Sequence, residues 1–123
     1  MAAAELDLYI EQGAKFYRTL TLKSANVPID ITGYSFRGQI RKSQSDSTIL
    51  ASFSFNILNQ VSFTGQVEMT MSDAITSSLP VPTATSFVRK TIKYIYDVEV
   101  VNSSGVVDRM LQGSAEVSPE VTR

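Results

Sequence analysis

The chain has 123 residues, of which 43% are hydrophobic, and its 11 basic and 12 acidic residues give a net charge of −1. This length suits one compact domain, and the scattered, balanced charges argue against both a nucleic-acid footprint and a membrane-binding surface. Cys and His are both absent, which excludes disulfides and thiolate metal sites and removes the commonest general base and transition-metal ligand.

Short alternating apolar segments follow one another along the chain. The alternation predicts strands over residues 6–10, 16–23, 35–41, 49–57 and 61–71, each with one apolar face. Gly65 interrupts the last of these strands, which indicates a bulge. Ser72 is a good N-cap residue, so we expect a short helix over residues 72–79, which Pro80 and Pro82 end.

The clearest pattern lies in the last quarter of the chain, on either side of the tetrapeptide Asn102-Ser103-Ser104-Gly105. Alternation on both sides of a Gly-containing turn predicts a long β-hairpin. A lone hairpin is marginally stable in water, so this one requires further strands. Its two apolar faces are expected to hold Ile92, Tyr94, Tyr96, Val98 and Val100 on the first strand, and Val107, Leu111, Ala115 and Val117 on the second.

Together these elements predict an all-β fold of about seven strands with at most one short helix, arranged as an antiparallel sandwich or barrel. We expect one domain over residues 1–123, with extended ends at 1–5 and 119–123 that become ordered only against a neighbour. The expected core includes Phe36, Ile40, Phe53, Phe55, Val98 and Leu111.

No secretory or membrane-spanning segment is expected. Acidic residues stand near the start of the chain, where a signal peptide needs a basic start and an apolar run. The longest uncharged stretch, residues 47–67, alternates and is broken by polar residues, so it indicates strands and not a membrane helix.

Two clusters could carry chemistry or recognition. Asp97 and Glu99 lie on one strand face, where two carboxylates could act as acid and base or bind a cation; the alternative is a solvated face. Tyr94 and Tyr96 could stack on a sugar or a base; the alternative is a core position with the hydroxyl at the rim. No phosphate-binding glycine pattern is present. We therefore expect no enzymatic activity, no cofactor and no metal.

Basic pairs and the chain end supply the candidate partner-binding residues. Each pair could contact an acidic partner, although a solvated strand face is the simpler interpretation. The candidates are Arg37, Arg41, Arg89, Lys93, Glu120 and Arg123.

Three segments, residues 7–22, 28–43 and 96–123, carry the order IEQG, aromatic-R-x-L-x-L, I-D-ITGY, Q-I-R and the ending VSPEVTR. This order resembles small virion proteins of tailed phages, cyanophages in particular, and the ITGY element is similar to the amino-terminal module of phage baseplate upper proteins. The resemblance implies an immunoglobulin-like β-sandwich in a structural protein of the virion. It also implies other virion proteins as partners and many copies in a symmetric assembly, made in the host cytoplasm.

The leading hypothesis is a docking and assembly module of the tail, at the baseplate or the fibre attachment region. An alternative is a capsid decoration or neck protein. A second alternative, from another class, is a glycan- or receptor-binding module that uses Tyr94, Tyr96 and an acidic neighbour.

Overall fold

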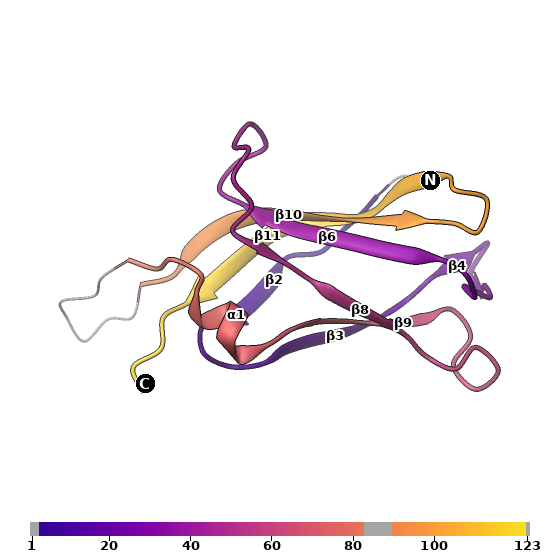
Figure 1. Cartoon of the computed structure of the whole chain (residues 1–123), viewed down its shortest axis with the longest axis horizontal. Helices are drawn as coiled ribbons and strands as arrows, with labels where there is room; N and C mark the ends of the chain where they lie inside the picture. The colour runs from indigo at the N-terminus through magenta and orange to yellow at the C-terminus, as the bar shows by residue number, and fades with distance from the viewer. Residues whose placement is uncertain (1–2, 83–89, 123) are drawn as a thin grey trace.

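The computed structural model describes residues 3–82 and 90–122. The chain forms strands and one short helix (Figure 1): β1 (Ala4–Glu5), β2 (Leu8–Glu11), β3 (Phe16–Thr21), β4 (Lys23–Ser24), β5 (Val27–Pro28), β6 (Ser35–Arg41), β7 (Ala51–Ser52), β8 (Ser54–Ile57), β9 (Gln66–Met71), α1 (Asp73–Ser77), β10 (Ile92–Val101) and β11 (Val107–Ser118).

Two sheets enclose the core. The larger has the order β1-β11-β10-β6-β7, with β2 also on β11, and the smaller has the order β3-β9-β8. Taken in chain order, β3 and β6 to β11 correspond to strands B, C, C′, D, E, F and G of an immunoglobulin domain. With these letters the smaller sheet has the order B-E-D and the larger sheet contains the order G-F-C-C′, as in that fold. The expected all-β, immunoglobulin-like sandwich is confirmed. The larger sheet is mixed at one edge, since β1 and β2 run parallel to β11.

The strand expected over residues 49–57 is two strands in different sheets. β7 pairs with β6 in the larger sheet, and β8 pairs with β9 in the smaller one. Between them, the backbone N–H of Phe53 donates to the carbonyl of Gly38 at 2.9 Å. Ala51 and Phe53 are both buried. The alternation continues across the break because the core lies on the same side of the chain before and after it.

The strand expected over residues 61–71 begins only at Gln66. Residues 60–65 form turns, and Val61 is 94% exposed. Gly65 has a φ of +80° and lies so close to the next segment that an added Cβ would be 2.6 Å from the carbonyl oxygen of Leu22. It therefore ends a turn and does not form a bulge within a strand.

The long hairpin is confirmed, with β10 and β11 paired from Ile92↔Val117 to Val101↔Val107. The register shifts after Val98↔Leu111 to Glu99↔Arg109, which leaves Met110 as an extra residue on β11. This bulge turns Val107 to the outer face, where it is 45% exposed. Our placement of Val107 on the buried face was wrong for this reason.

Aromatic rings fill the centre of the core. The ring centroid of Phe53 lies 5.9 Å from those of both Phe16 and Tyr96. A cluster of three rings from β3, β10 and the β7–β8 link thus joins the two sheets.

Four of the six expected core residues, Ile40, Phe53, Val98 and Leu111, are buried. Phe36 and Phe55 are only partly buried, which corrects our expectation for them. They stack on each other with centroids 5.7 Å apart and pack against a second core cluster of Leu22, Ile31, Val67 and Val100.

The helix is confirmed as α1. Its N-cap is Ser72, whose side chain accepts a hydrogen bond from the backbone N–H of Ile75 at 3.3 Å. No helix within residues 3–82 and 90–122 is long and apolar enough to cross a membrane.

The chain ends are more closely attached than we expected. Ala4–Glu5 forms β1 on β11, and the backbone N–H of Leu6 donates to Gln112 at 2.9 Å. At the other end, the N–H of Glu120 donates to the side chain of Gln12 at 3.0 Å. Of residues 119–122, only Val121 and Thr122 are exposed. Residues 1–2 and 123 lie outside the described part.

Candidate functional site

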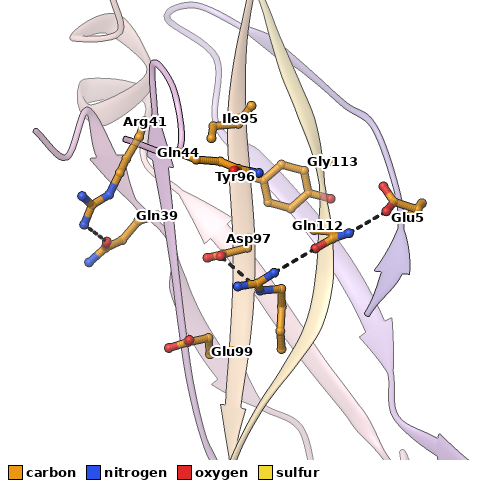
Figure 2. Close-up of a pocket in the computed structure, with 11 residues that line it drawn as sticks. Glu5, Gln39, Arg41, Gln44, Ile95, Tyr96, Asp97, Glu99, Gln112 and Gly113 are labelled. Carbon is orange, nitrogen blue, oxygen red and sulfur yellow. Dashed lines mark hydrogen bonds and ion pairs between the residues drawn. The ribbon is translucent and has the colours of Figure 1, made fainter. Parts of the chain in front are cut away.

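The outer face of β6, β10 and β11 is polar and hollowed. A concavity of about 720 Å³ is lined by Glu5, Gln39, Arg41, Gln44, Ile95, Tyr96, Asp97, Glu99, Arg109, Gln112 and Gly113 (Figure 2). The face is crossed by paired groups: Arg37 lies 2.6 Å from Glu99, and Arg109 lies 3.5 Å from Asp97. Opposite charges therefore compensate each other across this face.

These pairs decide between the two interpretations of Asp97 and Glu99. Each carboxylate faces its own arginine, so the two do not converge on a common point. Within the described ranges, no group of three or more acidic side chains is arranged to hold a metal ion. The pair belongs to a solvated strand face.

The candidate partner-binding residues lie at separate places. Arg37, Arg41 and Lys93 share the outer face of the larger sheet, where Arg41 donates to Gln39 and to the carbonyl of Asp46. Glu120 lies near α1, where its carboxylate accepts from Ser77. Arg89 and Arg123 lie outside the described residues. The structure places the first three on one face and leaves Glu120 apart.

Tyr94 and Tyr96 are core residues, 3% and 4% exposed. Their hydroxyls donate to the backbone carbonyls of Pro80 at 2.6 Å and Leu6 at 2.5 Å. Burial raises the pKa of both, and the Asp7 carboxylate adds to the rise at Tyr96. Their rings do not present a stacking face, which removes the proposed contact from the glycan-binding alternative.

Replacing Tyr96 by Phe is expected to lower the free energy of unfolding by about 1 kcal/mol at neutral pH, because the Leu6 carbonyl loses its donor.

The raised pKa of Tyr96 also predicts how the free energy of unfolding depends on pH. Above pH 10.0, the ordinary pKa of the phenol, the unfolded chain loses this proton while the folded chain keeps it. The unfolding free energy of the wild type therefore falls as pH rises further. Urea denaturation from pH 8 to 11 should show a shallower fall in Tyr96→Phe; parallel curves would contradict the assignment.

Exposed apolar side chains gather at one end of the sandwich. Five of the nine large apolar side chains that are exposed in the described part lie in or next to three connections: 22–34 between β3 and β6, 58–65 between β8 and β9, and 102–106 between β10 and β11. Figure 1 shows these connections at the end opposite α1. We call this surface the loop end; its apolar residues are Val27, Val61, Phe63, Val106 and Val107.

Two side chains, those of Asn59 and Gln60, hydrogen-bond to backbone groups of the connection 58–65. The side-chain Oδ1 of Asn59 accepts from the N–H groups of Val61 and Ser62 at 2.9 and 3.2 Å. Gln60 accepts from Gly65 and from Ile31 in the neighbouring connection, at 2.8 and 3.1 Å. The exposed positions of Val61 and Phe63 are thus fixed by polar contacts beneath them.

The other two connections are fixed in the same manner. Asn102 accepts from the N–H groups of Ser104 and Val106 at 2.9 and 3.0 Å. Asp30 accepts from the hydroxyl and the N–H of Thr32 at 2.6 and 2.9 Å, and these bonds lower the pKa of Asp30.

The tip that carries Val27 is a strained turn. Ala25 and Asn26, which join β4 to β5, have φ values of 51° and 65°. A left-handed Ala is unfavourable and persists only where its surroundings impose it.

Several large apolar side chains on a preordered surface make the loop end the candidate binding site, because single exposed apolar residues need no explanation whereas several at one end of a domain do. Sequence reasoning missed the loop end. Val61 and Phe63 alternate with polar residues like a strand, so the pattern concealed their exposure. The available signal was the pair Asn59-Gln60, whose side chains cap turns.

No family model and no curated protein matches the chain. Among solved structures, an extracellular domain of the voltage-gated sodium channel beta4 subunit, described as a parallel homodimer, is 11% identical, with a TM-score of 0.49 over 98% of this chain and 97% of that chain. A structure from a study of cell-adhesive interactions of sodium channel beta subunits is 13% identical, with a TM-score of 0.40 over 96% of this chain and 92% of that chain. The assignment of an immunoglobulin-like sandwich rests on the strand order and register.

Proposed function

We propose that this protein is a docking module of a tailed-phage particle and that it binds neighbouring virion proteins through the loop end. The observation that carries the docking role is the gathering of five exposed apolar side chains on three connections fixed by Asn59, Gln60 and Asn102. The order of motifs in residues 7–22, 28–43 and 96–123 supports the virion setting, in the tail, baseplate or fibre attachment region.

The chemistry of the loop end favours a protein partner with an apolar recess. Preordered loops lose little conformational entropy on binding, so a larger part of the contact energy appears as affinity. The polar outer face, with Arg37, Arg41 and Lys93, would set the orientation at the rim of the contact more than it would add affinity. Repeated copies in a symmetric particle allow each contact to be modest.

Val61→Asp tests the proposal directly, because Val61 is 94% exposed and its replacement should leave the fold unchanged. We expect incorporation into particles to fall by about tenfold, equivalent to the loss of about 1.4 kcal/mol at the contact. The measurement is complementation of a phage that lacks the gene, followed by quantification of the protein in purified particles.

Ile49→Asp is the matched control, since Ile49 is 45% exposed and lies in the connection between β6 and β7, outside the three connections of the loop end. It should be incorporated like the wild type, and both variants should keep the wild-type urea midpoint. Equal incorporation of Val61→Asp and the wild type would contradict the docking role of the loop end.

A further inference from the structure

Strand β3 leaves one edge of the smaller sheet open. β3 pairs with β9 on one side, and within residues 3–82 and 90–122 no strand pairs with its other side. In immunoglobulin domains that have a strand A on this sheet, that strand covers the edge. Here the amino-terminal strands β1 and β2 pair with β11 in the other sheet instead.

The backbone groups that face this open edge follow from the register. The N–H of Leu22 donates to the carbonyl oxygen of Gly65 at 2.8 Å, so Leu22 stands at a hydrogen-bonded position at the end of the ladder. Hydrogen-bonded and non-hydrogen-bonded positions alternate along antiparallel strands. The even residues of β3 therefore bond to β9, and the N–H and C=O groups of Tyr17, Thr19 and Thr21 point away from the sheet.

The common devices that block an open edge are mostly absent from β3. Its six residues contain no Pro, and its register with β9 has no bulge. Tyr17, Thr19 and Thr21 are all exposed. One such device is present, because Arg18 is a charge on the core-facing side of the strand, although its side chain is exposed. An edge of this kind can accept another strand.

We propose that two copies of this chain pair antiparallel through β3, on a two-fold axis at Thr19, to form one continuous sheet β8-β9-β3-β3-β9-β8. Thr19 then faces Thr19 of the second copy, and Tyr17 faces Thr21. All three outward residues of each copy find partners, which makes about six hydrogen bonds because each of the three pairs exchanges two.

Arg18 selects this register and favours a copy of the chain as the occupant. On the core-facing side, Arg18 lies across from Leu20 of the second copy, whose side chain can cover the aliphatic part of the arginine. Moving the axis to Arg18 would place the two arginines directly opposite each other, which is unfavourable. Moving it to Leu20 leaves only two hydrogen-bonded pairs within the strands. The axis at Thr19 therefore gives the most hydrogen-bonded pairs within β3 and keeps its two arginines apart, although it brings Lys15 opposite Lys23 at each end of the strand.

This interface shares no residue with the loop end, so its failure and that of the docking proposal are distinguishable. The first test is sedimentation equilibrium over a concentration series of the full chain. We expect the wild type to form dimers that dissociate on dilution. Thr19→Lys should weaken the dimer at least about tenfold, because it places two like charges on the axis.

Asn56→Lys is the matched control, since Asn56 lies on the outer face of the same sheet but on its far strand, β8. It should dimerise like the wild type. Circular dichroism should show that both variants are folded. A wild type that stays monomeric at its highest soluble concentration would overturn the proposal, and so would a Thr19→Lys dimer as tight as that of the wild type.

The second test reads the register. The chain has no Cys, so a single introduced thiol can link only two copies. Opposite α-carbons in a hydrogen-bonded pair are about 5.5 Å apart, within the reach of a disulfide. Thr19→Cys should link to itself under mild oxidation. Tyr17→Cys should not, but should link to Thr21→Cys when the two are mixed. Linkage of Tyr17→Cys to itself as fast as that of Thr19→Cys would exclude the proposed axis.

Discussion

Phe53→Ala is expected to lower the free energy of unfolding by about 3–5 kcal/mol. The ring is 6% exposed, lies 5.9 Å from the rings of both Phe16 and Tyr96, and covers the backbone of Gly38, where an added Cβ would be 3.0 Å from it. Its removal opens a cavity at the centre of the core, where the chain crosses between sheets and no disulfide joins them. The rigid neighbouring strands prevent collapse around the missing ring.

Urea denaturation followed by circular dichroism measures this change. Phe63→Ala is the control for the same chemical change at a site that is 49% exposed. There we expect a loss of about 1 kcal/mol or less, because little apolar surface leaves the interior. A loss below about 1 kcal/mol for Phe53→Ala would show that the core is assigned to the wrong face.

Gly65→Ala is expected to cost about 3 kcal/mol, and Gly105→Ala only about 1 kcal/mol. The two glycines have nearly the same φ, +80° and +84°, so the backbone strain of alanine is the same at both. They differ in their surroundings. A Cβ at Gly65 would be 2.6 Å from the Leu22 carbonyl oxygen, whereas at Gly105 nothing lies within 4 Å.

The difference between these two variants isolates the close packing of connection 58–65 against connection 22–34. Hydrogen exchange should also show faster exchange of the Ile31 amide in Gly65→Ala, because Gln60 bonds both Ile31 and Gly65. Equal costs for the two substitutions would mean that the connections of the loop end do not support each other.

Alternation predicted most of the strands because each sheet has one buried face. The hairpin of β10 and β11 and the buried positions of Ile40, Phe53, Val98 and Leu111 follow from that pattern, whereas the helix followed from the N-cap residue Ser72. The pattern could not reveal the change of sheet at Phe53, because apolar and polar residues keep the same alternation before and after the break. Nor could it reveal the bulge at Met110, which reverses the face of Val107.

The proposed binding surface was harder to predict than the fold. Arg37 and Arg41 stood out as charges, but in the structure Arg37 is paired with Glu99 and Arg41 bonds to Gln39 and Asp46. The alternation placed Val61 in a strand, and an apolar residue type does not show whether its side chain is buried. Only the turn that Asn59 and Gln60 form places it in solvent.

A density map of the intact particle tests the central claim most directly, because it shows which surface of this protein meets a neighbour. We predict that Val27, Val61, Phe63 and Val106 lie buried against another virion protein, and that the outer face of β6, β10 and β11 lies at the rim of that contact. A loop end that faces solvent in every copy, or purified particles that lack the protein altogether, would contradict the account.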